Sequence, residues 1–390
     1  MPEMPGNAAY TAAARRAAGR LRAPAGDLLL LLHAALDAPA EAAARLARSC
    51  AALSPRCTGE EARLLPLVWW NLGGAAAPDP AVRALGPAYH ESWSRFQGQV
   101  AAAERVLAAL HAGGVRTLLL KGLPLALTVY ARPALRAMAD IDVLVAPEDR
   151  DAAAALLGRI GYRALRHPGA GELAVMHSVG LVGPDGSTAD LHWYALQECC
   201  HPGADATLWE HAVPCGVGGV EALAPSPEGL LLTALAHGVR WNGEPPARWA
   251  ADAVTLLRRH GSALDWDRLC ADAQRRRLAY LLAATLAWLT AELAAPVPGE
   301  VLGALAAAGV ARSERAELWA RQGRPTLARG VVIRWCAHAR RAAAGVDERG
   351  VRGLLRYLRA AWGVERGAAL PLAALRRGAD KLQWRSQGGS

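Results

Sequence analysis

Apolar and polar positions alternate at helical spacing along most of this chain. Between residues 87 and 112, for example, Trp93, Val100, Val106 and Leu110 recur on one side, which is typical of an amphipathic helix. The same pattern predicts helices over residues 28–52, 60–72, 87–112, 228–239, 248–259, 278–293, 299–308, 312–319, 325–344 and 350–362. The chain is therefore predicted to be mostly helical.

One stretch, residues 115–194, departs from this pattern and reads as a small sheet. Strands are predicted over residues 115–120, 140–146, 173–182 and 187–196, and a further strand is predicted to begin at Gly161. Helices are predicted over residues 123–131 and 147–160. The last two strands flank Pro184-Asp185-Gly186, a turn sequence typical of a hairpin. The order β-α-β-α-β plus a hairpin predicts an α+β fold, a mixed sheet with helices to one side.

This pattern divides the chain into three regions. Residues 1–100 form an N-terminal helical region, 101–200 the sheet-containing core, and 201–390 a C-terminal helical region. The composition agrees, because the chain is 53 % hydrophobic but only 5 % aromatic, and alanine, a strong helix former, supplies much of the apolar share.

Charge is distributed unevenly along the chain. The formal net charge is +9, and residues 311–390 alone hold 17 Lys and Arg against 6 Asp and Glu. Such a region can serve RNA, an anionic membrane or an acidic partner, but we favour a solvated arginine face and expect no specific nucleic-acid binding. We expect an apolar stripe over residues 350–362 (Val351, Leu354, Leu355, Leu358, Trp362), with Arg352, Arg356 and Arg359 opposite.

The cysteines indicate the redox compartment of the protein, and the hydropathy indicates whether a segment crosses a membrane. Seven cysteines without CxxC spacing favour a reducing compartment, so we expect a cytoplasmic protein. The adjacent pair Cys199-Cys200 beside His201 is a poor zinc chelate. The most apolar window, residues 278–297, contains Thr285, Thr290 and Glu292, so we interpret it as a buried helix and expect no transmembrane segment.

Carboxylates are the candidate chemistry of the predicted sheet. Asp140 and Asp142 stand two residues apart at the start of a strand, so their side chains share one face. Asp190 lies on a later strand with the same alternation, and His192 follows it on the same side. Carboxylate oxygens suit Mg²⁺, so this face predicts a metal-dependent phosphoryl or nucleotidyl transferase. His192 is interpreted as a proton-transfer group, a hydrogen-bond partner of a carboxylate or a satisfied, partly buried histidine.

Cationic residues stand close to these acids in the sequence. Lys121, one of only two lysines in the chain, precedes Gly122 at the first strand-to-helix turn. Arg136 lies in the segment before Asp140, where it either turns toward phosphates or is solvated.

These motifs resemble the uncharacterised nucleotidyltransferase family of bacteria, within the DNA polymerase β-like nucleotidyltransferase superfamily. The resemblance rests on Leu120-Lys121-Gly122, Tyr130, Arg136, the segment Asp140–Val145, Gly161-Tyr162 and the segment Asp190–Trp193, and more weakly on His237-Gly238, Trp249–Asp252 and Asp265-Trp266. It implies transfer of a nucleoside monophosphate from an NTP such as ATP to an unidentified acceptor, a small molecule or a protein, with two Mg²⁺ ions. Asp140, Asp142 and Asp190 match the metal-binding acids, and Asp190 also matches the residue that activates the acceptor hydroxyl.

Two features leave alternatives open. The superfamily has Ser or Gly after the turn glycine, whereas Leu123 follows Gly122 here, so Lys121 is proposed to contact the β- or γ-phosphate instead, with an ion pair to Asp140 or Asp142 as the structural alternative. The same departure fits a catalytically degenerate nucleotide-binding protein. A DxD-type glycosyltransferase is a further alternative, although it predicts a larger nucleotide domain before Asp140. His237, Trp249 and Asp252 belong to the C-terminal helical region. Packing or helix capping explains these residues at least as well as a role in closing over the site.

Overall fold

A computed structural model describes residues 21, 23–47, 59, 61–239, 246–307, 311–322, 326–364 and 367–370. The first helices are α2 (Asp27–Leu36), α3 (Pro39–Ala47), α4 (Leu65–Asn71), α5 (Pro80–Arg83) and α6 (Gly86–Ala112). The continuous helix predicted from residue 28 is wrong, because the chain is extended at Asp37 and a new helix begins at Pro39. The long helix over residues 87–112 is confirmed as α6.

The predicted mixed sheet is present and has five strands. Its strands are β1 (Leu118–Leu120), β2 (Ile141–Leu144), β3 (Arg163–Ala164), β4 (Ser178–Val182) and β5 (Thr188–His192), in the spatial order β1-β2-β5-β4-β3. β2 and β5 run parallel, and the other neighbours are antiparallel, including the predicted hairpin β4–β5. The prediction of a strand from residue 173 is wrong, because α9 (Ala170–Leu173) precedes the hairpin.

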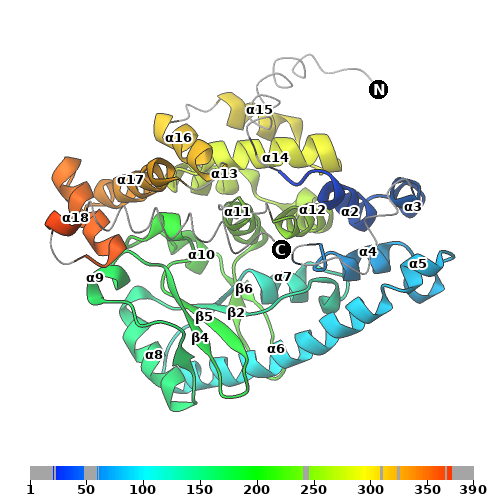
Figure 1. Cartoon of the computed structure of the whole chain (residues 1–390), viewed down its shortest axis with the longest axis horizontal. Coiled ribbons are helices and arrows are strands. Elements are labelled where there is room, and N and C mark those ends of the chain that lie inside the picture. The colour runs from blue at the N-terminus through cyan, green and yellow to red at the C-terminus, as the bar shows by residue number, and fades with distance from the viewer. Residues whose placement is uncertain are drawn as a thin grey trace.

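Helices cover both faces of this sheet, so the prediction that they lie to one side is wrong. Leu119, Val143 and Leu191 point to one face, where they pack with residues of α6 and α8 (Arg150–Arg159). Leu118, Leu120 and Leu144 point to the other, where Trp193, α10 (Ala206–Glu210) and α11 (Pro227–Gly238) contribute. Figure 1 shows α6 below the sheet and α10 and α11 above it. Side-chain alternation therefore places Asp142, Asp190 and His192 on the face that looks toward α11.

The C-terminal helical region shares a hydrophobic core with the N-terminal helices. Leu31 and Val68 of α2 and α4 belong to the same buried cluster as Leu231, Leu257 and Leu286. The helices after α11 are α12 (Arg248–His260), α13 (Trp266–Arg275), α14 (Ala279–Leu293), α15 (Gly299–Ala307), α16 (Arg312–Arg321), α17 (Leu327–Ala343) and α18 (Gly350–Trp362). Sequence reasoning missed α13 and a two-stranded sheet of β6 (Val213–Pro214) and β7 (Leu223–Ala224).

No helix in the described ranges is long and apolar enough to cross a membrane. The window expected to be a buried helix contains α14, in which Leu282, Leu286 and Leu289 are buried. In the same ranges, the cysteines, including Cys199 and Cys200, are free.

Arginines of the basic C-terminal region are partly internal, so the expectation of an outer arginine face is wrong for three of them. Arg321, Arg340 and Arg341 are buried. Arg321 donates to Glu198 and Glu317 at 2.8 and 2.7 Å, and Arg340 donates to Glu317 at 3.0 Å. The expected stripe on α18 is also incomplete, because Val351 is 73 % exposed and Leu355 is 45 % exposed. These buried ion pairs join α16 and α17 to the segment that follows β5.

This network predicts a stability effect of Glu317→Gln. The substitution removes the charge that Arg321 and Arg340 share in a site that is only 4 % exposed. Because hydrogen bonds to charged groups contribute about 1.5–3 kcal/mol, we expect the free energy of unfolding to fall by that amount in urea titrations. The control is Glu348→Gln, since Glu348 pairs with Arg356 at the surface and an exposed pair contributes less than about 1 kcal/mol. Equal losses in the two variants would contradict this account.

Candidate functional site

Strand register brings the candidate acids together. In the parallel pair β2–β5, Asp142 stands directly beside Asp190, and in the antiparallel pair β1–β2 it stands beside Leu120. Lys121 therefore follows β1 at the point where Asp142 lies. Asp140 precedes β2, which begins at Ile141, so the prediction that Asp140 opens this strand is wrong.

Asp142 is the most enclosed of the candidate acids, with 3 % of its surface exposed. Its Oδ1 atom accepts a hydrogen bond from the Lys121 ammonium at 2.5 Å and lies 2.9 Å from Nε2 of His192. Burial alone would raise the pKa of Asp142, but the Lys121 charge and the contact with His192 outweigh it and hold that pKa well below its usual range. Asp142 is therefore a carboxylate at neutral pH.

His192 is fully buried beside both strand acids. Its Nε2 atom lies 4.0 Å from Oδ2 of Asp190, and ligand atoms of Asp142, Asp190 and His192 all lie within 4.8 Å of one another. The structure shows both contact with a carboxylate and full burial of the hydrogen-bonded ring, so two of the three interpretations of His192 describe it together, and a role in proton transfer stays a prediction. The arrangement gives two carboxylates and one imidazole that can hold a metal ion.

Asp140 lies outside this close group but lines the same cavity. The residue is exposed, yet neighbouring groups desolvate its carboxyl, and this desolvation, followed by repulsion from Asp142, raises the pKa of Asp140. Convergence of Asp140 with Asp142 and Asp190 on one ion stays a prediction.

The turn after β1 holds Lys121 in a backbone conformation that non-glycine residues rarely adopt. Lys121 has φ 52° and ψ −109°, and it is one of three non-glycine residues with positive φ in the described chain. Such conformations cost about 1–3 kcal/mol and are concentrated at functional sites. A Cβ atom at Gly122 would lie 2.9 Å from Nη1 of Arg136, so a larger residue there would displace the guanidinium. The turn therefore places the ammonium group against Asp142 and the Arg136 guanidinium against the glycine.

Arg136 is neither solvated nor free, so the interpretation as a solvated arginine is wrong. It is 7 % exposed, and its Nε and Nη2 atoms each donate to Asp252 of α12 at 2.9 Å. The hydroxyl of Tyr130 donates to the same carboxylate at 2.7 Å. Two of the three guanidinium nitrogens are thus held by Asp252, while Nη1 lies beside Gly122.

Asp252 is the residue whose importance sequence reasoning missed. Its pairing with Arg136 spans 116 positions, and in the sequence packing or capping explains an acid there equally well. The sequence marks it only weakly, through the place of Trp249–Asp252 in the family resemblance and as an acid on an otherwise apolar helix face between Trp249 and Leu256. In the structure, Asp252 joins the C-terminal helical region to the segment before β2.

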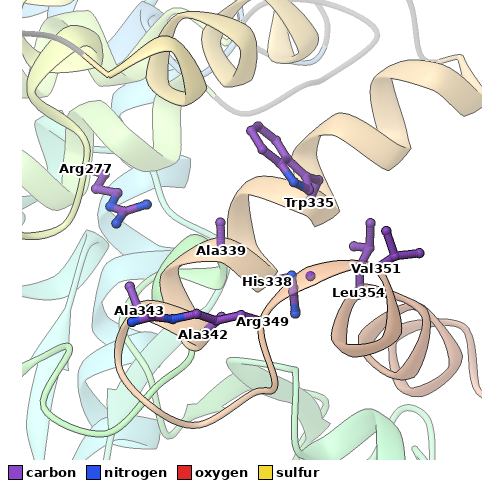
Figure 2. Close-up of a pocket in the computed structure, with 10 residues that line it drawn as sticks. Arg277, Trp335, His338, Ala339, Ala342, Ala343, Arg349, Val351 and Leu354 are labelled. Carbon is purple, nitrogen blue, oxygen red and sulfur yellow. The ribbon is translucent and has the colours of Figure 1, made fainter.

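The candidate acids and cations line one cavity of about 280 Å³. Its walls include Asp140, Asp142, Asp190, Lys121, Gly122 and Arg136 from the sheet region and His237, Arg248, Trp249 and Asp252 from α11 and α12. A larger cavity of about 400 Å³ lies between α17 and α18, where Figure 2 shows Trp335, His338, Val351 and Leu354 with Arg277 and Arg349. No carboxylate of the described residues lines that larger cavity, whereas the three candidate acids of the sheet region line the smaller one.

One known protein family matches the part of the chain that contains this site. The model of a family described as uncharacterised nucleotidyltransferase matches residues 57–295, which include all the residues of the smaller cavity. No curated protein matches the chain. The match ends before α15, so α16, α17 and α18 lie beyond it.

Proposed function

The chain belongs to the uncharacterised nucleotidyltransferase family, and from this premise we propose that it transfers a nucleoside monophosphate from an NTP to a hydroxyl-bearing acceptor. The acceptor is a small molecule or a protein. The observation that carries the proposal is the pairing of Asp142 with Asp190 on adjacent strands, inside a cavity that also holds Lys121 and Arg136. Carboxylates that can bind a metal and cations that can bind phosphates thus line one cavity, as nucleotide binding requires.

The donor groups fit a divalent ion. Asp142 and Asp190 supply hard oxygen ligands, with His192 within reach of both and Asp140 at the edge of the cavity. When bound, Mg²⁺ ions would neutralise phosphate charge and lower the pKa of the acceptor hydroxyl, as in other two-metal transferases. Both the two-ion stoichiometry and the place in the DNA polymerase β-like superfamily belong to the proposal.

The chain's own residues orient the reactants. Asp190, whose side chain is 33 % exposed, is the carboxylate of the close group that an acceptor can reach, and we assign it the acceptor proton. The acceptor oxygen then forms a bond to the α-phosphorus, the bond from that phosphorus to the bridging oxygen breaks, and pyrophosphate leaves. Lys121 and Arg136 hold the departing phosphates through charge-assisted hydrogen bonds.

Asp252 acts through Arg136 as a positioning residue. Because Asp252 engages Nε and Nη2, it fixes the guanidinium plane and leaves Nη1 directed at the Lys121-Gly122 turn. Preorganised donors of this kind stabilise phosphate charge without reorganising during the reaction. Arg136 therefore presents one nitrogen, in a fixed orientation, to the terminal phosphates.

A screen with labelled NTPs tests the proposed activity. The protein is incubated with each NTP, Mg²⁺ and a cell extract, and both pyrophosphate release and labelled products are measured. We expect metal-dependent pyrophosphate release together with one labelled class of acceptor. A catalytically degenerate nucleotide-binding protein would bind the NTP and release no pyrophosphate, and this outcome would overturn the proposal. The glycosyltransferase alternative gains no support from the family match.

Lys121→Ala tests the assignment of the phosphate contact. If Lys121 binds the terminal phosphates, the substitution weakens NTP binding by about 1.5–3 kcal/mol in calorimetric titrations with Mg²⁺. The observed contact with Asp142 also predicts some loss of thermal stability in the absence of nucleotide. The matched variant is Lys121→Gly, which removes the same ammonium and relieves the positive φ, so it should be more stable than Lys121→Ala by about 1 kcal/mol. A lower melting temperature with unchanged NTP affinity in both variants would remove Lys121 from the nucleotide site.

A further inference from the structure

The orientation of His192 carries information beyond its closeness to the two acids. Its Nδ1 atom lies 3.3 Å from the carbonyl oxygen of Tyr194, and its Nε2 atom faces Asp142. A carbonyl oxygen only accepts hydrogen bonds, so Nδ1 donates to it, and an ionised carboxylate also only accepts, so Nε2 donates to Asp142 in the metal-free protein. A divalent ion that replaces the Nε2 proton meets a nitrogen lone pair, while the Nδ1 proton stays hydrogen-bonded to the Tyr194 carbonyl.

The Nε2 atom faces oxygens of both strand acids. Nε2 lies 2.9 Å from Oδ1 of Asp142 and 4.0 Å from Oδ2 of Asp190, and both oxygens bear lone pairs when ionised. The Lys121 ammonium lies 2.5 Å from that Asp142 oxygen and 3.4 Å from Nε2. Electron-pair donors from β2 and β5 thus converge on a point that favours a cation.

Metal-binding histidines in proteins commonly have this arrangement. One ring nitrogen binds the ion while the other donates its proton to a backbone carbonyl or carboxylate, which fixes both the tautomer and the ring orientation. The contact with the Tyr194 carbonyl supplies that second interaction here. Full burial of His192 prevents the ring from turning to solvent.

We propose that Nε2 of His192 is a direct ligand of the divalent ion, together with carboxylate oxygens of Asp142 and Asp190. The site is then a mixed nitrogen and oxygen site. Mg²⁺ prefers oxygen ligands, whereas imidazole suits first-row transition ions, and site affinity for such ions rises from Mn²⁺ onward. The ligand set therefore favours Mn²⁺ or a later ion over Mg²⁺ in this cavity. This inference rests on the metal site of the proposed function but does not depend on the acceptor or on turnover.

A hydrogen-bonding role for His192 gives different expectations. A protonated ring that only holds Asp142 in place leaves the ion with oxygen ligands alone. Its removal would then alter protein stability without altering which ions bind. Nitrogen coordination to the bound ion is consequently the property to measure.

Pulsed electron paramagnetic resonance of Mn²⁺ bound to the full chain measures it directly. We expect the wild-type spectrum to show direct coupling to a histidine nitrogen, and we expect the coupling pattern to change when histidine is labelled with ¹⁵N. His192→Gln should abolish the coupling and weaken Mn²⁺ binding by about tenfold or more. The control is His177→Gln, since the His177 ring packs edge-on at 5.3 Å from His192 and should not carry the coupling.

Calorimetry completes the test. Wild-type protein should bind Mn²⁺ about tenfold or more tightly than Mg²⁺, and His192→Gln should reduce that preference. Absence of nitrogen coupling in the wild-type protein overturns the proposal even if the variant fails to fold. Nucleotidyl transfer observed with Mg²⁺ alone would leave the proposed function standing, so the two failures are distinguishable.

Discussion

Replacing Asp142 with asparagine is expected to abolish nucleotidyl transfer. The change preserves shape but removes the charge of a buried carboxylate of the cavity, which lies beside both Asp190 and His192. A bound metal ion supplies several kcal/mol of transition-state stabilisation, and each 1.4 kcal/mol corresponds to a factor of about ten. Turnover should therefore fall about a thousandfold or more in a pyrophosphate-release assay.

Controls separate this effect from a loss of folding. In Asp142→Asn the amide retains an acceptor oxygen for Lys121, but the buried ion pair is lost, so circular dichroism should show a folded protein with a reduced melting temperature. Asp151→Asn on α8 is the matched variant, since the Asp151 side chain is 81 % exposed, and it should behave like wild type. Asp142→Asn retaining more than about a tenth of wild-type turnover would contradict a metal role for Asp142.

Arg136→Ala is expected to destabilise the fold and to weaken nucleotide binding together. It leaves Asp252, 3 % exposed, without the guanidinium that satisfies both of its oxygens. Breaking a buried pair by removing one partner costs about 3–5 kcal/mol, because the remaining charge stays buried. Urea unfolding should show a loss of this size, and titration with an NTP should show weaker binding.

A double variant separates the two losses. Arg136→Gln combined with Asp252→Asn replaces the ion pair with neutral amides, and the amide oxygen at position 252 still accepts from Tyr130. Stability should largely return, while NTP affinity should remain low because no cation at position 136 faces the Lys121-Gly122 turn. Recovery of full NTP affinity in the double variant would show that Arg136 serves only the fold.

The pattern of residues predicted which side chains share a face but not which partners they meet. Strand parity placed Asp140, Asp142, Asp190 and His192 on one face, and the structure confirms this for the last three, whereas Asp140 precedes the strand. That Asp142 stands directly beside Asp190 depends on the register of two parallel strands, and no local turn fixes that register. The sequence leaves Lys121 free to bind phosphate or to pair with either nearby acid, and only the fold shows its contact with Asp142.

Long-range partners account for the features that the sequence could not reveal. Arg136 meets Asp252 across 116 positions, and Arg321 meets Glu198 across 123. Composition favoured a solvated face for the C-terminal arginines, since charged residues are rarely buried unless they are paired. The acidic partners of Arg321 and Arg340 lie in α16 and in the segment after β5, so the burial of these two arginines became visible only once those elements were packed together.

The most direct test of nucleotidyl transfer is to follow the α-phosphate and the γ-phosphate of one NTP separately. The protein is incubated with an NTP labelled at either the α- or the γ-phosphate, with Mn²⁺ or Mg²⁺ and the acceptor fraction, and wild type is compared with Asp142→Asn. We predict that the α-label enters the acceptor product while the γ-label leaves as pyrophosphate, and that Asp142→Asn gives neither. Transfer of the γ-label to the acceptor, or tight NTP binding with no transfer of either label, would contradict nucleotidyl transfer at this site.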